Sequence, residues 1–450
     1  MTPSRRKFIQ QAAFGGAGMF VFTPSSLLAE QRQKSKTSAN DKIRFGLIGC
    51  KGMGWSNMRA HFELDKVECV AICDVDQTFL DKRAIDAEMI QGFKPKKYND
   101  YRKLLEDKDV DAVIIGTPDH WHCLMLVDAV QAGKHVYVEK PLANSIQECN
   151  IMMAAAQRSG KLVQVGQWQR SGIHYKQAID YVRSGKLGQI RLVKVWSYQG
   201  WMKPVDVVAD SAIPKGVNYD MWLGPAPKRP FNKNRFHFNF RWFWDYAGGL
   251  MTDWGVHEID IALYAMGVKA PKSIMASGGK LAYPNDASET PDTMQAVFEY
   301  ENFNMLWEHA IGINGGNYGR TEGIAFIGNS GTLVLNRQGW ELIPEYDRKE
   351  DGIRYNRIEG LPEQPIPRRA NYVVDHAGNF IDAMYANDAS MLNTNIVSGS
   401  VAAINAHMGN IAYKTGRKIY WDATKGNFGN DKEANALINA SYHNGWKLPG

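Results

Sequence analysis

The chain has 450 residues, 44% of them hydrophobic, and is long enough for two or three domains with full cores. Its formal net charge is +6, which falls to +3 without Arg5, Arg6 and Lys7, in a segment that we expect to be removed. This small charge excludes the strongly basic surface of a nucleic-acid-binding protein. The five cysteines lie in the first third, with an odd count and no metal-ligand spacing, so we expect buried thiols and no metal site.

The first residues have the pattern of a twin-arginine export signal. Residues 4–10 read SRRKFIQ, and an apolar run from Ala12 to Phe22 follows them. This run is too short for a stable membrane span. The sequence therefore predicts a signal peptide at 1–29, export by the twin-arginine machinery to the periplasm, and a polar tether at 30–41.

A predicted strand at 43–49 leads into a glycine-rich loop and then a helix from about Trp55. Residues 49–54 read GCKGMG, whereas the usual dinucleotide fingerprint is G-x-G-x-x-G, so Lys51 replaces the middle glycine. Glycines in a strand-to-helix turn let backbone amides approach a pyrophosphate at the positive end of the helix. The predicted cofactor-binding residues of this loop are Gly49, Lys51, Gly52, Met53 and Gly54.

Three further apolar runs, at 67–72, 111–116 and 136–138, alternate with helical stretches. This alternation predicts an α/β domain with a doubly wound parallel sheet, in which ligands bind beyond the carboxyl ends of the strands. Asp74 follows the second strand, where it can accept hydrogen bonds from a ribose diol, and its charge favours NAD over NADP. The other residues predicted to line the cofactor cleft are Thr117, Pro118, His120, His122, Glu139 and Lys140.

The stretch 245–260 reads DYAGGLMTDWGVHEID and carries the candidate active site. Asp253, His257 and Asp260 recur at i, i+4 and i+7, so a continuous helix would place them on one face. An aspartate one turn ahead of a histidine can orient the imidazole and support its charged form, as a general base near neutral pH requires.

Short apolar or alternating runs at 191–198, 293–300, 305–309, 323–328, 332–335 and 340–344 predict a second, mainly antiparallel sheet. Helical periodicity appears at 373–385 and 395–415, and the residues from 419 onward read as an arm that packs back on the body. Seven tryptophans lie between residues 166 and 260, and aromatic rings pair well with the apolar face of a pyranose. The predicted substrate-binding residues here are Gln167, Arg170, Trp242 and Trp244.

Several of these motifs together resemble the Gfo/Idh/MocA family, which includes glucose-fructose oxidoreductase and inositol dehydrogenase. They are the glycine loop, the Gly116-Thr117-Pro118 turn, Glu139-Lys140-Pro141, and Gly248-Gly249-Leu250 with Asp253-x-Gly255-x-His257-x-x-Asp260. The resemblance implies an N-terminal Rossmann domain for NAD or NADP (42–165) and a C-terminal α+β domain with an open, mainly antiparallel sheet (166–418). It also implies that Lys140, Asp253 and His257 form the catalytic group and contact substrate, and that the chain assembles as a homodimer or homotetramer.

The sequence thus predicts an exported NAD-dependent oxidoreductase that acts on a hydroxyl of a sugar or glycoside, for example a carbohydrate 3-dehydrogenase. Because little free NAD is expected outside the cytoplasm, the cofactor would be held tightly and recycled within the protein. One alternative is an NAD-dependent glycoside hydrolase that oxidises its substrate transiently and eliminates the aglycone. A second is a sugar-binding protein without catalytic activity.

Overall fold

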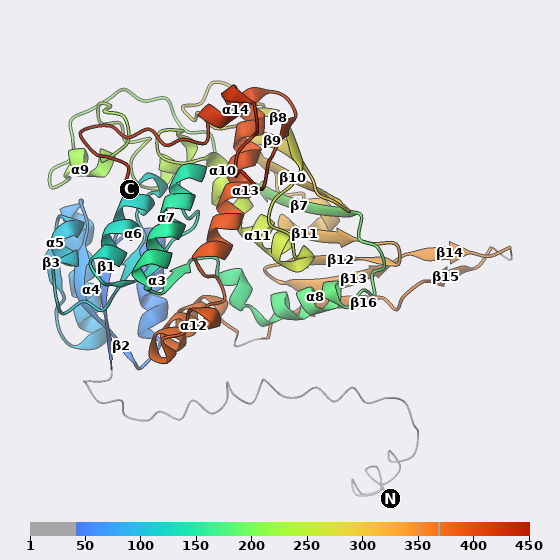
Figure 1. The fold of residues 1–450 in the computed structure, drawn as a ribbon, viewed down its shortest axis with the longest axis horizontal. Coiled ribbons are helices and arrows are strands. Elements are labelled where there is room, and N and C mark those ends of the chain that lie inside the picture. Colours follow the sequence, from blue (N-terminus) through green and yellow to red (C-terminus); the bar gives the residue numbers. More distant parts are fainter. Residues whose placement is uncertain (1–41, 351, 368–369) are drawn as a thin grey trace, which may run out of the picture. The chain divides into compact units, whose positions relative to one another are not determined.

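The structure is a computed structural model, and it describes residues 42–350, 352–367 and 370–450. The predicted export signal (1–29) and tether (30–41) lie outside the described residues. The described residues belong to one compact unit that contains two large sheets, one built from the N-terminal part of the chain and one from its middle (Figure 1).

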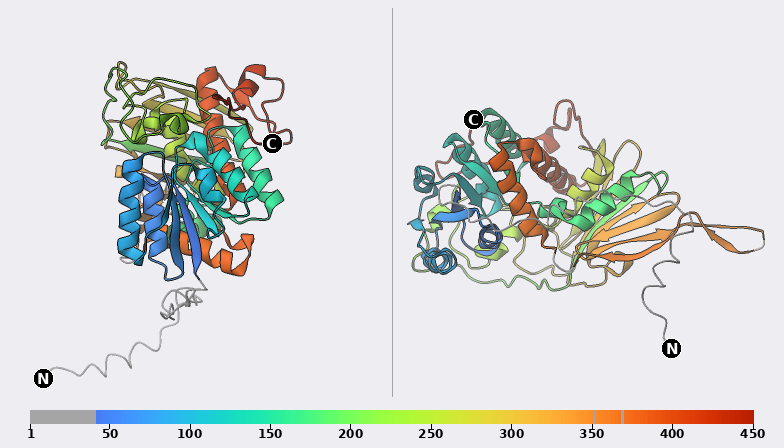
Figure 2. Two further views of the ribbon diagram at one scale, coloured as in Figure 1. Left: turned by 90° about the vertical axis from the view of Figure 1, so that its left-hand side faces the viewer. Right: turned by 90° about the horizontal axis from the view of Figure 1, so that it is seen from below.

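The first sheet has six parallel strands within the described range, in the order β3-β2-β1-β4-β5-β6 (Figure 2). The strands are β1 (Ile43–Ile48), β2 (Val67–Cys73), β3 (Lys96–Tyr98), β4 (Ala112–Ile115), β5 (His135–Val138) and β6 (Val163–Val165). The helices between them are α3 (Gly52–Phe62), α4 (Gln77–Gln91), α5 (Tyr101–Leu105), α6 (His122–Gln131) and α7 (Ile146–Ser159). All four residues of β4 are buried, as in a strand covered on both faces. The prediction of a doubly wound Rossmann sheet is confirmed.

The second sheet has nine strands in the described part of the chain, in the order β16-β13-β12-β11-β7-β10-β9-β8-β17. Neighbours pair antiparallel except β7 and β10, which are parallel, so the prediction of a mainly antiparallel sheet is confirmed. The strands are β7 (Leu192–Gln199), β8 (Ser273–Gly279), β9 (Thr293–Glu299), β10 (Asn304–Ile311), β11 (Glu322–Ile327), β12 (Gly331–Asn336), β13 (Gly339–Pro344), β16 (Leu361–Pro365) and β17 (Ile419–Tyr420). A hairpin of β14 (Tyr346–Arg348) and β15 (Arg354–Asn356) projects beyond this sheet (Figure 1).

One face of the second sheet is covered by α8 (Ile173–Arg183), α11 (Gly255–Met266) and α13 (Ile396–Thr415). Buried and more exposed side chains alternate along β9, which explains this packing. Met294 and Phe298 are fully buried, while Gln295 between them is exposed. Successive strand residues point to opposite faces, so the apolar set of β9 faces the helices.

Two helices from the segment that we grouped with the second domain also cover the Rossmann sheet. Phe380 of α12 (Tyr372–Ala386) packs on Phe45 of β1, with ring centroids 6.2 Å apart. Before α13 begins, Thr394 accepts a 3.0 Å backbone hydrogen bond from Val165 of β6. α13 continues onto the second sheet, and therefore ties the two sheets together.

The five cysteines are buried free thiols, as predicted. Among the described helices, none has the length and apolar character needed to cross a membrane. Likewise, no group of three or more His, Cys, Asp or Glu residues in this part of the chain is placed to hold a metal ion.

Candidate active site

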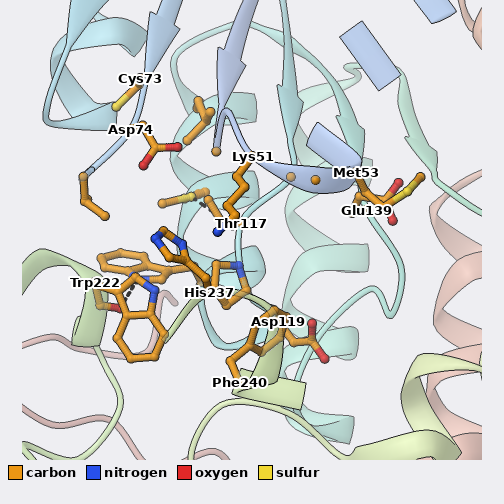
Figure 3. Close-up of a pocket in the computed structure, with 18 of the residues that line it drawn as sticks. Lys51, Met53, Cys73, Asp74, Thr117, Asp119, Glu139, Trp222, His237 and Phe240 are labelled. Carbon is orange, nitrogen blue, oxygen red and sulfur yellow. Dashed lines mark hydrogen bonds between the residues drawn. The ribbon is translucent and has the colours of Figure 1, made fainter. Parts of the chain in front are cut away.

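A pocket of about 380 Å³ lies at the carboxyl ends of the Rossmann strands, where the glycine loop forms its floor (Figure 3). Gly49 has a φ of +85°, and a Cβ there would lie 2.8 Å from the Gly116 backbone. A Cβ on Gly54 would lie 2.0 Å from the Gly49 carbonyl oxygen. These glycines let the β1 loop, the start of α3 and the end of β4 pack backbone against backbone. α3 begins at Gly52, earlier than predicted, so its N-terminus faces the pocket.

Asp74 lies at one end of this pocket, beyond β2. Its carboxylate accepts hydrogen bonds from the backbone N–H of Cys50 at 2.7 Å and of Asp76 at 2.9 Å. Burial raises the pKa of Asp74 to about 6, although these hydrogen bonds oppose the shift. The side chain of Lys51, in the place of the middle glycine, extends over the Phe79 ring with Nζ 4.4 Å from the centroid.

Lys140 lies at the other end of the pocket, directly after β5. Its Nζ donates to the Asp253 carboxylate at 2.8 Å and to the Asp253 backbone oxygen at 2.9 Å. The same carboxylate oxygen accepts from Nε of Arg241 at 3.1 Å. Burial alone would raise the pKa of Asp253, but the two cations overcome this effect and hold it well below its usual range.

The prediction of one continuous helix through 253–260 is wrong. Asp253 ends the short helix α10 (Gly249–Asp253), and α11 begins at Gly255. In a continuous helix the Asp253 carbonyl would accept from the N–H of His257. Lys140 takes that carbonyl instead, and the His257 N–H donates to Trp254 at 3.0 Å. The three polar residues therefore do not share one regular helical face.

His257 is buried, and its ring lies 5.0 Å from the Trp168 ring. Its Nδ1 has no hydrogen-bond partner among the described residues, so the predicted orientation by Asp253 is absent. The Asp253 carboxylate instead binds Lys140 and Arg241 through its Oδ1. Burial, together with the positive charges of Lys140 and Arg337, lowers the pKa of His257 well below its ordinary value. The imidazole is therefore neutral.

The side of the pocket opposite the glycine loop is closed by residues 200–243, which we call the strap. The strap contains α9 (Tyr219–Leu223) and the 3₁₀-helix η4 (His237–Trp242). It contributes Met221, Trp222, His237, Phe238, Phe240 and Arg241 to the pocket lining. Figure 3 shows Trp222 and Phe240 on the opposite side of the pocket from Asp74, and the Lys51 side chain extends toward His237.

The strap is bonded to the loop after β2. Asn218 donates its backbone N–H to Val75 at 2.8 Å, and the Gly216 carbonyl accepts from Gln77 at 3.0 Å. His237, at an uncommon φ of +56°, bonds through Nε2 to the Asp76 carboxylate at 3.0 Å. These bonds hold the strap against the Rossmann domain beside Asp74.

Comparison with known families identifies the fold. Residues 43–167 match the oxidoreductase-family model for an NAD-binding Rossmann fold, and residues 181–278 match the model for the C-terminal alpha/beta domain of the same family. The chain belongs to the Gfo/Idh/MocA family. Its glycine cradle, the N-terminus of α3 and Asp74 fit the pyrophosphate and ribose of NAD.

Curated relatives match this Gfo/Idh/MocA chain over part of their length. A glycosyl hydrolase family 109 protein of Shewanella baltica (strain OS185) is 33% identical over 202 residues, which are 41% of this chain and 44% of that protein. A glycosyl hydrolase family 109 protein of Shewanella sp. (strain ANA-3) is 37% identical over 153 residues, a third of each chain. The chain thus matches less than half the length of these relatives.

Solved structures share the fold at low sequence identity. Levoglucosan dehydrogenase, in complex with NADH and levoglucosan, has a TM-score of 0.62 and 18% identity, covering 84% of this chain and 99% of that one. The aldose-aldose oxidoreductase of Caulobacter crescentus has a TM-score of 0.61 and 19% identity, covering 84% and 100%.

The structure brings most of the predicted cofactor residues together. Nine of them line the pocket: Gly49, Lys51, Gly52, Met53, Asp74, Thr117, Pro118, Glu139 and Lys140. Gly54 does not line it but packs against the Gly49 backbone. His120 and His122 do not line it. The Nε2 of His120 lies 3.1 Å from the Trp222 carbonyl, and His122 lies 2.8 Å from the Pro141 carbonyl, so both buried rings brace loops instead.

The predicted substrate residues other than the catalytic group have protein partners. Arg170 forms a buried two-bond ion pair with Asp260, at 2.6 and 2.7 Å. Trp242 is buried in an aromatic cluster, and Trp244 donates its indole N–H to Glu289. Gln167 is buried and donates to Val256 at 3.4 Å. None of these four side chains lines the described cofactor pocket.

Three residues at the site were not among the predicted ones. Arg241 shares the Asp253 carboxylate, and His237 joins the strap to Asp76. Asp119 lines the pocket, and burial raises its pKa to about 8. Asp119 lies in the turn TPDHWH, and the position of this turn directly after a strand could have indicated that Asp119 lines the pocket. Arg241 and His237 lie in the strap, where no sequence motif indicates their role.

We predict that the protein stripped of cofactor binds NAD more weakly at pH 5 than at pH 8. Asp74 titrates near pH 6, and its protonated form accepts ribose hydrogen bonds less well, so affinity should fall by up to about tenfold. Calorimetric titration at both pH values measures this. Asp74→Asn should bind weakly at both, and an unchanged pH dependence in that variant would contradict the assignment.

Proposed function

We propose that this protein is an exported oxidoreductase that uses NAD to oxidise a hydroxyl-bearing carbon of a sugar or glycoside, for example as a carbohydrate 3-dehydrogenase. The observation that carries the proposal is the position of Lys140, held by two hydrogen bonds to Asp253 at the rim of the NAD pocket. NAD bound there supplies the acceptor for a hydride from carbon. The names of the structural neighbours, which include sugar oxidoreductases, support a carbohydrate substrate.

The roles of the residues follow from their bonds. An ammonium group has three N–H donors, and Asp253 occupies two of those of Lys140. The third is available to a substrate hydroxyl oxygen, whose developing negative charge it stabilises. His257 follows Asp253 by four residues, its low pKa favours the neutral imidazole, and it is the proposed base that removes the hydroxyl proton.

Tight retention of the cofactor is part of the proposal. The strap is bonded to the Rossmann domain beside Asp74, and it is held in turn by the C-terminal residues. Asn444 donates to the carbonyls of Gly224 and Ala226 at 2.8 Å, and the Trp446 ring lies 4.9 Å from that of Trp121. A retained cofactor suits a protein that leaves the cytoplasm, because it must be recycled in place by a second half-reaction.

A second candidate function is an NAD-dependent glycoside hydrolase. The relatives named glycosyl hydrolase family 109 proteins favour it. In this scheme a ring carbon is oxidised to a ketone, which acidifies the neighbouring C–H, so that the aglycone leaves by elimination. Water then adds, and the hydride returns to the sugar, so no external oxidant is consumed.

A panel of monosaccharides, disaccharides and p-nitrophenyl glycosides distinguishes these functions. For the dehydrogenase we expect absorbance of reduced nicotinamide to appear in the purified protein with at least one sugar. Release of p-nitrophenol without added acceptor would select the hydrolase. Absence of nicotinamide from the purified protein, with no response to any sugar, would contradict both and favour a sugar-binding protein.

Replacement of Lys140 by methionine should abolish oxidation of the active sugar while NAD stays bound. The variant keeps much of the side-chain stem but loses the donor to the substrate oxygen, so the rate should fall by about 100-fold or more. Single-turnover absorbance measures the rate, and extraction measures the bound NAD. Oxidation at the original rate would exclude Lys140 from the chemistry.

Replacement of His237 by asparagine should accelerate NAD release. Asparagine tolerates the left-handed backbone at this position but is too short to keep the bond to Asp76. Loss of a hydrogen bond to a charged group should increase the release rate by about tenfold or more. Exchange of bound NAD against labelled NAD measures it, with the exposed strap variant Lys215→Ala as control. Equal exchange in both variants would argue against the strap as the barrier.

A further inference from the structure

Several buried polar atoms around His257 lack hydrogen-bond partners within the described part of the chain. They are Nε1 of Trp168, Oε1 of Gln169, Nδ1 of His257, Oε2 of Glu258 and Nε of Arg337. We call these five residues the unpaired cluster. They come from three separate elements: the 3₁₀-helix η3 (Trp168–Ser171), α11, and the turn between β12 and β13.

Side-chain contacts connect the unpaired cluster from His257 to Glu258. The Trp168 ring packs on His257 at 5.0 Å, and the guanidinium carbon of Arg337 lies 4.6 Å from the centroid of the Trp168 ring. Gln169 donates through Nε2 to the other carboxylate oxygen of Glu258 at 3.0 Å. Glu258 itself follows His257 on α11. The unpaired atoms thus form one neighbourhood behind the candidate base.

Leaving these atoms without partners would be costly. Each buried donor or acceptor without a hydrogen bond costs about 1–3 kcal/mol, and five of them would consume much of the stability of a domain. Buried polar atoms of this kind are normally bonded to internal water molecules, each of which makes about three hydrogen bonds. Water bridging is therefore the expected state of the unpaired cluster.

The unpaired cluster contains an alternative partner for His257 Nδ1. Asp253 was the predicted partner, but no hydrogen bond joins it to Nδ1, and Lys140 and Arg241 both bind its Oδ1. Glu258 is the carboxylate of the cluster, and one of its oxygens is unpaired. We propose that Glu258, acting through water bound in the unpaired cluster, orients His257 and exchanges protons with it.

This role rests on the proposed function, in which His257 removes a hydroxyl proton. The proton passes from the sugar oxygen to Nε2 of His257, and the proton on Nδ1 crosses the bridging water to the ionised Glu258. The sugar carbon becomes a carbonyl as its hydride leaves to NAD. Reduction of a sugar in the second half-reaction reverses each transfer, so Glu258 holds the proton between the two half-reactions.

The charges around Glu258 determine the pH range in which its carboxylate can accept a proton. Burial raises its pKa to about 7, Arg337 opposes the increase, and Glu322 of β11 adds to it. Asp260 also raises this pKa, and the Gln169 hydrogen bond lowers it. The tyrosines packed nearby, Tyr175 of α8 and Tyr372 of α12, are themselves held neutral by burial. His257 faces Lys140, Arg337 and Asp253, as described above.

Histidine NMR of the purified protein tests the proposal without a substrate. The protein is labelled with ¹³C at histidine Cε1, and the His257 signal is assigned by its loss in His257→Gln. Because a water bridge transmits the ionisation of Glu258 to the imidazole, the His257 shift should show an inflection near pH 7. Glu258→Gln should remove this inflection, whereas Glu345→Gln, which alters an exposed carboxylate, should leave it unchanged.

Substitutions at two charged residues near Glu258 provide a second test, which does not depend on whether the Glu258→Gln variant folds. Arg337→Met removes a positive charge and should move the inflection to higher pH, by about half a pH unit or more. Glu322→Gln removes a negative charge and should move it to lower pH. Opposite shifts place the titrating group beside Arg337 and Glu322, and loss of the inflection in Glu258→Gln identifies this group as Glu258.

The proposal is overturned if the inflection is absent from the wild type, if it persists in Glu258→Gln, or if it does not respond to the two neighbouring charges. Failure of the sugar panel would remove the proposed function but leave the titration result intact. Conversely, an active sugar with no inflection at His257 would remove only the role of Glu258. With an active sugar, Glu258→Gln should also lose the acid limb of the pH–rate profile at unchanged bound NAD.

Discussion

The contact between Lys140 and Asp253 determines the local structure of the site. Lys140 lies two residues beyond the end of strand β5, and its ammonium binds both the carboxylate and the backbone carbonyl of Asp253 in the second domain. Additional hydrogen bonds offset the desolvation cost of a buried ion pair, and Arg241 supplies one here by donating to the same Asp253 oxygen. Because the carbonyl is taken, the helix breaks after Asp253, and α11 begins anew with His257 in its first turn.

Much of the fold could be predicted because local patterns reflect burial. The Rossmann strands are continuous apolar runs, since both faces of that sheet are covered, and the long helices α12 and α13 have clear periodicity. Strand β8, with the sequence SIMASGG, and strand β16, which contains two prolines, were missed. Small residues and prolines carry little strand preference, so these strands depend on pairing with distant neighbours.

The candidate site was predictable where one turn of chain determines the geometry. Gly49 and Asp74 lie in turns that directly follow strands, so their place at the sheet edge follows from the pattern alone. The pairing of Arg170 with Asp260 joins residues from separate elements, and nothing in either segment indicates it. The same holds for His237 and Asp76, which lie 161 positions apart in the sequence. Side-chain partners of this kind emerge only from tertiary packing.

The charges of the site explain why a neutral histidine suits the proposed base. Lys140 and Arg241 are two cations around one carboxylate, Asp253, whose pKa they keep low, while burial keeps Asp119 protonated near neutral pH. This excess of positive charge favours a negative oxygen on the substrate and opposes a positive charge on His257. A proton taken by His257 is therefore held weakly at that position. The site stabilises the deprotonated sugar oxygen more than the protonated base. A second proton acceptor near His257 would therefore lower the free energy of the proton transfer.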